Sequence, residues 1–192
     1  MKIGENNEIL LKGNLITPGY YNKPEINATS FTDGWFHTGD AGKLENGILY
    51  ITDRIKDLFK TSNGKYIAPQ QIENLLVTDK YIDQVAVIGD LRKFVTALIV
   101  PDYAAVKDYA EQMKIEYKDI EDLLNNPKIT SLIEGRIANL QEGLAKYEQV
   151  KRFKLLPNPF TSDNGELTLT LKLKRKVINE HYNKEIEYMY SY

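Results

Sequence analysis

The sequence predicts an α+β fold in which a short β-rich segment over residues 1–53 precedes a compact α+β domain over residues 54–192. Three observations lead to this prediction. The first segment alternates strand-like runs with turn residues and holds few helix-forming residues. The second opens with a helix-like stretch that is followed by two apolar, β-branched runs. Between about residues 102 and 149, apolar side chains recur at helical spacing, which predicts a helical insertion.

The β-rich segment is expected to contain a strand, a turn and a hairpin. Glu8–Lys12 is typical of a short strand that stops at a glycine. Gly34–Asp40 reads Gly-Trp-Phe-His-Thr-Gly-Asp and is expected to place its aspartate on a glycine-framed turn. Lys43–Asp53 is expected to form a hairpin that turns at Glu45-Asn46-Gly47, because Asn-Gly favours a tight turn.

The domain that follows is expected to pack helices on a small sheet. Pro69 is well placed in the first turn of a helix whose apolar side includes Ile72, Leu75 and Leu76. The further expected elements are strands over Gln84–Ile88 and Phe94–Val100, helices over Tyr103–Met113 and Ile129–Tyr147, a strand over Val150–Leu156 and an amphipathic helix over Leu173–Met189.

The composition favours a packed, soluble protein. The 192 residues are 42% hydrophobic and 27% charged, which suits a folded core and not a disordered chain. Lys plus Arg number 25 and Asp plus Glu 27, a near-balance that argues against a general nucleic-acid binder. The N-terminus lacks the apolar core of a signal peptide, and no apolar run approaches the ~20 residues of a membrane span. A cytoplasmic protein without a transmembrane segment is therefore expected.

The residue inventory also limits the chemistry. The chain has no cysteine, which excludes disulfides, thiolate metal ligands and thiol catalysis. Only His37 and His181 can offer an imidazole, so no metal site is expected. Trp35 and His37 are interpreted as packing and hydrogen-bonding residues and not as catalysts.

Asp40 and Arg54 form the first candidate site. A carboxylate accepts hydrogen bonds from two hydroxyls and a guanidinium donates a planar fork, so the pair suits a polyhydroxyl, phosphate-bearing ligand such as a nucleotide. Two plainer interpretations stay open. Asp40 would cap its own turn, and Arg54 would form a surface ion pair with Asp53 or Asp57.

Two lysine-bearing segments are further candidates. Lys60–Lys65 is a glycine loop that can line a channel for a phosphorylated ligand through backbone N–H groups, although it lacks the spacing of a phosphate-binding loop. Lys172 begins a basic cluster that can stabilise charge on a phosphate oxygen, whereas a solvated helix face accounts for Lys174 and Lys176. The apolar stripe over Ile129–Tyr147 is interpreted as core packing, with a partner-binding face as the alternative.

Taken together, these segments resemble the AMP-forming acyl-CoA synthetases of the adenylate-forming superfamily, in the form of the long-chain fatty acid–CoA ligases. The motifs occur in the family's order across nearly the whole chain. In that order, the matching segments are Glu8–Gly13 and Pro18–Tyr21, then Gly34–Asp40 (the ribose-binding segment), Ile51–Asp57 (the hinge), Gly64–Glu73 (the loop beyond it) and Gly165–Arg175 (the terminal lysine motif).

The resemblance implies a role for each matched residue. Asp40 would bind both ribose hydroxyls of the nucleotide, and Arg54 would assist it. Lys56 would be the hinge about which a mobile C-terminal domain rotates between two half-reactions. Gly64 and Lys65 would line the passage for the pantetheine arm of CoA.

Lys172 would be the catalytic lysine that bridges the fatty-acid carboxylate and the α-phosphate during adenylation. The implied chemistry is ATP plus fatty acid giving acyl-AMP and pyrophosphate, followed by displacement of AMP by CoA, with Mg²⁺ as the metal cofactor of the full-length enzyme. Two positions depart from the family's pattern. Many members have glycine where Leu171 stands, and long-chain members often have proline where Leu169 stands, so this loop is expected to be organised differently.

The resemblance also implies a missing partner. The family's phosphate loop, adenine-binding segment, fatty-acid tunnel and metal ligands lie in a large N-terminal domain that this sequence does not contain. Residues 1–53 would then be the β-rich tail of that domain and residues 54–192 the mobile C-terminal domain, and the isolated chain is expected to be inactive. Two alternatives stay open: a free-standing α+β binding or interaction module, and a piece of an adenylating enzyme for another carboxylic acid.

Overall fold

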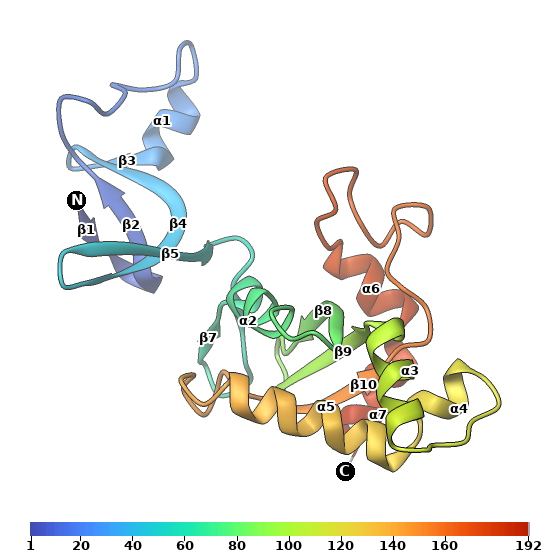
Figure 1. The fold of residues 1–192 in the computed structure, drawn as a ribbon. Coiled ribbons are helices and arrows are strands. Elements are labelled where there is room, and N and C mark those ends of the chain that lie inside the picture. The colour runs from blue at the N-terminus through green and yellow to red at the C-terminus, as the bar shows by residue number, and fades with distance from the viewer. Residues whose placement is uncertain (192) are drawn as a thin grey trace. The chain divides into compact units, whose positions relative to one another are not determined.

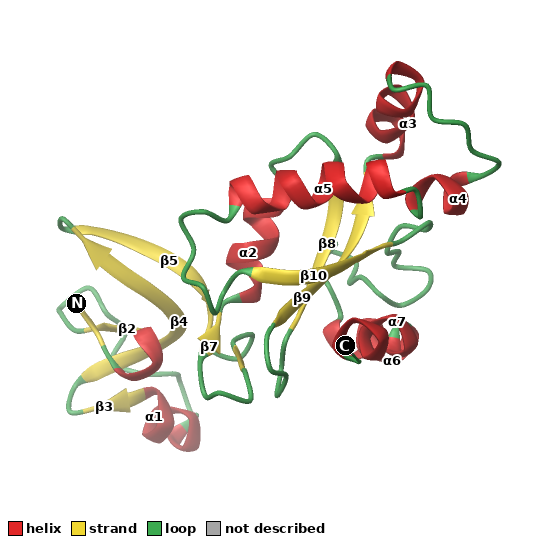
Figure 2. Ribbon diagram, turned by 90° about the horizontal axis from the view of Figure 1, so that it is seen from below, coloured by secondary structure: helices red, strands yellow, loops and turns green. Residues whose placement is uncertain are grey.

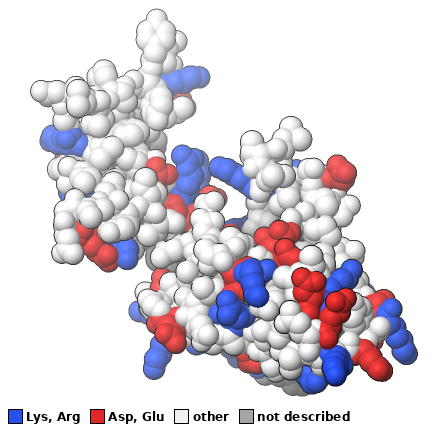
Figure 3. Space-filling model, viewed as in Figure 1, with Lys and Arg blue, Asp and Glu red and all other residues white. Residues whose placement is uncertain are grey.

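The computed structural model describes residues 1–191 and divides the chain into two compact units, Met1–Leu58 and Phe59–Tyr192 (Figure 1). Both units combine helix with sheet, so the predicted α+β class is confirmed. On the face shown in Figure 3, basic and acidic side chains are interspersed, in line with the net charge of -2.

The first unit is a five-stranded antiparallel sheet with one short helix. Its strand order is β1-β2-β4-β3, and β5 pairs with β4. The predicted first strand is confirmed as β2. The elements are β1 (Lys2–Ile3), the 3-10 turn η1 (Glu5–Asn7), β2 (Glu8–Leu11), α1 (Pro24–Ser30), β3 (Phe31–Thr32), β4 (Trp35–Glu45) and β5 (Ile48–Arg54).

The predicted hairpin is confirmed as β4 and β5. Asn46 and Gly47 close it with positive φ angles of 52° and 80°, the backbone of a turn whose twist matches that of the strands. However, β4 already begins at Trp35, so Asp40 lies inside a strand and the predicted turn over Gly34–Asp40 is wrong. Gly39 has a φ of +72°, and pairing with both neighbouring strands holds the segment in the sheet as an irregular strand.

The second unit is built on a three-stranded sheet of β8 (Ile82–Ile88), β9 (Val95–Pro101) and β10 (Val150–Leu155). The central strand, β9, runs antiparallel to β8 and parallel to β10. Alternate residues of β8 join two cores on opposite faces, Val85 and Val87 on one and Ala86 and Ile88 on the other. Burial on both faces explains why the strands read as continuous apolar runs.

Helices cover both faces of this sheet (Figure 2). The helices α2 and α5 supply Ile72, Leu76 and Ile133 to one core, and α6 and α7 supply Ile178 and Ile186 to the other. The elements are a short hairpin of β6 (Phe59–Lys60) and β7 (Tyr66–Ile67), then α2 (Pro69–Leu76), α3 (Tyr103–Gln112), α4 (Ile120–Leu124), α5 (Pro127–Leu140), α6 (Arg175–His181) and α7 (Asn183–Tyr190).

Two predicted helices have different bounds in the structure. The helix expected to reach Tyr147 ends at Leu140, because the next residue, Gln141, turns its side chain to the backbone N–H and C=O of Val150 at 2.9 and 3.3 Å. The expected C-terminal helix is two helices, α6 and α7, that meet at Tyr182. The ring of Tyr182 stacks edge-on against Phe160 at 5.7 Å. The core-packing interpretation of the stripe is confirmed for its helical part, since Ile129, Ile133 and Ile137 are buried.

The two units differ in how much core they hold. Both apolar cores lie in the second unit. In the first unit, the buried apolar side chains are Ile9, Leu10 and Ala41, whereas Leu15 and Tyr21 are almost fully exposed. A sheet that buries so few of its apolar side chains has little hydrophobic stabilisation of its own.

Candidate functional site

Asp40 and Arg54 are direct cross-strand partners in the hairpin of β4 and β5. The Nε atom of Arg54 donates to Oδ1 of Asp40 at 3.2 Å. The side chains are exposed by 66% for Arg54 and 31% for Asp40, so the ion pair contributes little to stability. The interpretation of Asp40 as a self-capping turn residue is wrong, because Asp40 lies in a strand and its carboxylate accepts from Arg54. The pair therefore presents a carboxylate and a guanidinium side by side at the surface.

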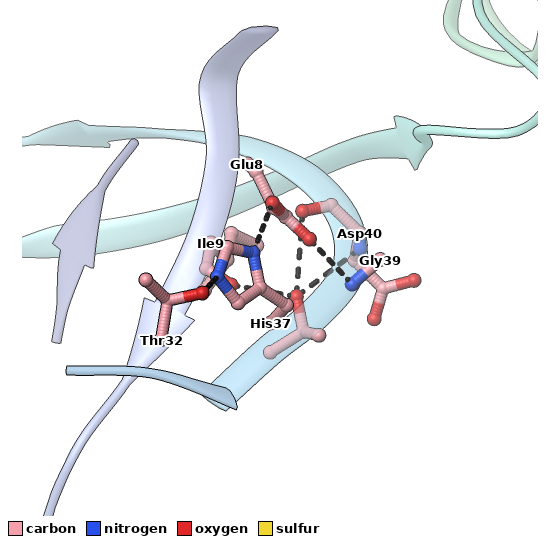
Figure 4. A network of polar contacts seen from close by, with 7 residues as sticks. Glu8, Ile9, Thr32, His37, Gly39 and Asp40 are labelled. Atoms are coloured by element: carbon pink, nitrogen blue, oxygen red, sulfur yellow. Dashed lines mark hydrogen bonds and ion pairs between the residues drawn. The ribbon is translucent and has the colours of Figure 1, made fainter. Parts of the chain in front are cut away.

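A chain of polar side chains holds the backbone just before Asp40 (Figure 4). Glu8 accepts the Gly39 N–H through Oε1 at 3.0 Å and contacts Nδ1 of His37 through Oε2 at 2.8 Å. The other ring nitrogen of His37, Nε2, lies 3.2 Å from Oγ1 of Thr32. His37 is thus a hydrogen-bonding residue, as expected. The sequence placed Glu8 in a strand but gave it no role at the site, because it comes next to Gly39 only through the pairing of β2 with β4.

Thr38 provides a second brace for the same segment. Its hydroxyl donates to the carbonyl of Ile9 at 2.8 Å and accepts the Asp40 N–H at 3.1 Å. The carbonyl of Gly39 accepts the N–H of Ile55 at 2.9 Å. Hydrogen bonds therefore fix the main chain on both sides of Gly39, and the Asp40 carboxylate extends from a rigid base.

Lys56 follows β5 in a tight turn. The N–H groups of Asp57 and Leu58 both donate to the carbonyl of Arg54, at 2.9 and 3.1 Å. The boundary between the two compact units lies just beyond, between Leu58 and Phe59. Lys56 itself is exposed.

The glycine loop joins β6 to β7, and four of its backbone N–H groups already have acceptors. The N–H groups of Thr61, Ser62, Gly64 and Lys65 donate to acceptors within the unit. Gly64 has a φ of +77°, which favours glycine at this turn. These four N–H groups are therefore engaged within the unit and not free to cradle a phosphate, and a ligand-lining role for the loop stays a prediction.

Lys172 lies at the end of a tight loop over residues 168–172. The N–H of Thr168 donates to the Lys172 carbonyl at 2.8 Å, and the Lys172 N–H donates to Oγ1 of Thr168 at 3.0 Å. Within this loop, Leu171 has a φ of +59°, an unfavourable conformation for a residue with a side chain. Leu169 and Leu171 are exposed, and so is Lys172. The loop is fixed at its base and projects its ammonium group into solvent.

One ion pair and one contact between a carboxylate and a histidine anchor the base of this loop. Arg175 donates from both Nη atoms to the carboxylate of Glu73 at 2.7 Å, and Nη1 also reaches the carbonyl of Val87 at 3.2 Å. The same carboxylate accepts the Val87 N–H at 2.8 Å. On the other side, Glu166 is buried, lies 3.2 Å from Nδ1 of His181 and accepts the Thr161 N–H at 3.0 Å. These contacts tie the Lys172 loop to α2, β8 and α6.

A pocket of about 210 Å³ in the second unit contains none of the predicted site residues. It lies along α4, β10 and α7, and Tyr182 forms part of its wall. Burial, and next the nearby carboxylate of Glu166, raise the pKa of Tyr182 to about 12.

This shift predicts an alkaline effect on stability. Because the folded-state pKa lies above the usual value near 10, the stabilisation is fully present below pH ~10 and is lost as the pH rises through about 12. Between pH 10 and 12, Tyr182→Phe is therefore expected to lose less stability than the natural chain. Urea unfolding at several pH values measures this, and parallel losses in the two proteins would contradict it.

Comparison with known proteins assigns the second unit. Residues 56–192 match the family described as the AMP-binding enzyme C-terminal domain. The chain belongs to this family. Among its relatives, the long-chain-fatty-acid–CoA ligase FadD15 of Mycobacterium tuberculosis is 35% identical over 193 aligned residues, which cover 100% of this chain and 32% of the ligase. Human long-chain-fatty-acid–CoA ligase 1 is 38% identical over 96% of this chain and 27% of its own length. The chain thus spans 27% to 32% of the length of these relatives.

Solved structures agree with the family. The adenylation domain of a carboxylate reductase from Mycobacterium chelonae has a TM-score of 0.68 and 28% identity, covering 96% of this chain and 28% of that one. The A-PCP didomain of a carboxylic acid reductase from Segniliparus rugosus, in complex with AMP, has the same TM-score and identity over 96% of this chain and 24% of that one. The similarity to these adenylation domains therefore includes residues of both units.

The structure brings some of the predicted site residues close to one another and leaves others apart. Asp40 and Arg54 meet in the first unit, Gly64 and Lys65 share one loop of the second, and Lys172 lies on another loop of that unit. Within residues 1–191, no group of three or more His, Cys, Asp or Glu side chains is arranged to hold a metal ion. No helix in that range is both long enough and apolar enough for a membrane span.

Proposed function

We propose that this chain is the C-terminal part of an AMP-forming long-chain fatty acid–CoA ligase. The enzyme would activate a fatty acid with ATP and Mg²⁺ to acyl-AMP and then transfer the acyl group to CoA. The observation that carries this proposal is the match of the whole chain to about a third of proteins named long-chain-fatty-acid–CoA ligases. In this proposal residues 1–53 end the large N-terminal domain, and residues 54–192 form the mobile domain.

In the first unit, Asp40 and Arg54 would hold the ribose of the nucleotide. The paired geometry supports this role, because a carboxylate next to a guanidinium offers acceptors to two hydroxyls and donors to further oxygens. The braced backbone before Asp40 supports it as well, since a fixed carboxylate loses less conformational freedom when a ligand binds.

In the second unit, Lys172 would place its positive charge between the carboxylate and the α-phosphate during adenylation. Its exposure on a loop with an anchored base supports this role, because a preorganised charge stabilises negative charge as it develops. Lys56, just before the boundary between the units, would act as the hinge. Gly64 and Lys65 would line the CoA passage.

The thin core of the first unit supports the idea that this chain is part of a larger protein. Its exposed apolar side chains exceed its buried ones, and such surfaces are usually covered by another part of the protein. The uncovered large side chains of this unit are Met1, Leu15, Tyr20, Tyr21, Ile26, Leu44, Ile48, Tyr50 and Ile51.

The proposal predicts that the isolated chain of 192 residues does not catalyse fatty-acid-dependent ATP–pyrophosphate exchange. The ligase that contains this chain should catalyse the exchange with a long-chain fatty acid. Radiolabelled pyrophosphate measures both reactions, and boiled enzyme and omission of the fatty acid are the controls. Robust exchange by the isolated chain would refute the view that it is one part of the enzyme.

A second candidate is a piece of an adenylating enzyme for another carboxylic acid. The similarity to adenylation domains of carboxylic acid reductases favours it. Exchange assays of the same ligase with short-chain, aromatic and long-chain acids separate the two candidates. A clear preference for an aromatic acid would replace the first proposal with the second.

A further inference from the structure

The direction of the Asp40 carboxylate depends on the peptide units around Gly39. Gly39 has a φ of +72°, which most residues adopt only at a cost. A Cβ atom at this position would meet nothing within 4 Å, so the backbone angle and not lack of space favours glycine. Glycine, however, is flexible and does not hold this angle by itself. Something else must therefore fix the chain here.

The strand β2 supplies that restraint through two neighbouring residues. Glu8 accepts the Gly39 N–H at 3.0 Å through its side chain, and the carbonyl of Ile9 accepts the Thr38 hydroxyl at 2.8 Å. The first of these bonds is charge-assisted and therefore stronger than a bond between neutral groups. It acts on the residue directly before Asp40.

Glu8 is itself held in place. Its second carboxylate oxygen lies 2.8 Å from Nδ1 of His37, and Nε2 of His37 lies 3.2 Å from Thr32. The side chain of Glu8 is only 19% exposed, and that of His37 31%. The tautomer that carries the proton on Nδ1 gives every link a donor and an acceptor, because Nδ1–H then donates to Glu8 and Nε2 accepts from the Thr32 hydroxyl. The carboxylate cannot swing away from Gly39 without breaking this chain.

We propose that Glu8 is a positioning residue that orients Asp40 for the ribose hydroxyls, and that His37 and Thr32 keep Glu8 in place. The inference rests on the proposed nucleotide-binding role of Asp40. It adds to that role a side chain that touches no substrate. Burying part of a carboxylate costs free energy unless it is hydrogen-bonded. Here the Glu8 carboxylate fixes the backbone angle at Gly39, which sets the direction of Asp40.

The first test uses the chain of 192 residues and no activity. Hydrogen exchange by NMR reports on the Gly39 amide in the natural chain and in Glu8→Ala. Loss of a charge-assisted bond should speed exchange at Gly39 by about 10- to 100-fold, while the amides of β9 in the second unit keep their rates. Glu5→Ala is the matched control, since Glu5 is an exposed acid three positions earlier. Unchanged exchange at Gly39 in Glu8→Ala would overturn the proposal.

The second test uses the ligase that contains this chain and a double-mutant cycle. Asp40→Asn should raise the KM for ATP in adenylation, and Glu8→Ala should raise it less, by roughly tenfold. The double variant should be no worse than Asp40→Asn alone, because Glu8 acts only through Asp40. Losses that multiply would show that Glu8 acts independently and would overturn the proposal.

These outcomes separate the inference from the function on which it rests. An unchanged KM in Asp40→Asn would refute the nucleotide role of Asp40 and, with it, the positioning role of Glu8. Exchange at the Gly39 amide would still show whether Glu8 holds the backbone. A raised KM in Asp40→Asn with none in Glu8→Ala would refute only the positioning role. If Glu8→Ala does not fold, Glu8→Gln replaces it, since glutamine keeps the shape and loses the charge, and its Gly39 amide should exchange at an intermediate rate.

Discussion

Lys172→Ala is expected to lower the rate of fatty-acid adenylation by about 10²- to 10³-fold in the full-length ligase that we propose for this chain. Removal of one preorganised positive group from a developing negative charge has an effect of this size. Attack of CoA on supplied acyl-AMP should be largely spared, because that half-reaction does not use the lysine in the proposed mechanism. ATP–pyrophosphate exchange measures the first step, and thioester formation from synthetic acyl-AMP measures the second.

Lys176→Ala is the matched control for this variant. Lys176 is a second exposed lysine on the same segment, in the first turn of α6, and its loss should leave both half-reactions unchanged. Equal losses of both half-reactions in Lys172→Ala would contradict the assigned role, since they would point to damage of the whole domain.

Arg175→Ala is expected to lower the free energy of unfolding of the second unit by about 3–5 kcal/mol. The substitution leaves the carboxylate of Glu73, which is 7% exposed, without its bidentate partner. Loss of the bidentate arginine from a buried carboxylate is far more costly than loss of a surface ion pair, even though Glu73 keeps the bond from the Val87 N–H. Urea unfolding of the chain, followed by circular dichroism, measures the change.

Arg175→Lys is the informative companion variant. Lysine keeps the positive charge but cannot donate the paired bonds of a guanidinium, so an intermediate loss is expected. Arg92→Ala removes a half-buried arginine that pairs with the exposed Glu187 and lies over the ring of Tyr190, and it should cost about 1–2 kcal/mol. A loss for Arg175→Ala no larger than that for Arg92→Ala would show that the Glu73 pair is not the anchor described here.

Local signals in the sequence were sufficient for much of the fold. Asn46-Gly47 predicted the hairpin turn because both positions need positive φ, and Pro69 predicted the start of α2 because its fixed φ suits a first helical turn. The apolar runs of β8 and β9 predicted buried strands. In each case a few adjacent residues determine the geometry.

Long-range contacts account for the elements that were predicted wrongly. Gly39 suggested a turn, but pairing of β4 with strands on both sides keeps the segment in the sheet. The apolar spacing that continues past Leu140 suggested more helix, but Gln141 bonds to the backbone of Val150 instead. Periodicity cannot reveal a side chain that competes for the backbone of a later strand.

The sequence also indicated some residues of the candidate site and not others. Asp40 and Arg54 were singled out because their residue types suit a nucleotide, and the register of the hairpin places them opposite each other. Glu8 has no comparable signal, because its partners His37 and Gly39 are brought to it by strand pairing. Spacing in a sequence finds residues that share one hairpin more readily than residues from separate strands.

The parallel pairing of β10 with β9 affects how the chain assembles as it leaves the ribosome. The helices α3, α4 and α5 are all synthesised between these two strands. Until β10 emerges, one edge of β9 has no partner, and an apolar strand with a free edge invites pairing with other chains. Nascent chains that stall within the helical insertion are therefore expected to be aggregation-prone and to need chaperones, and pairing with β10 removes this free edge of β9.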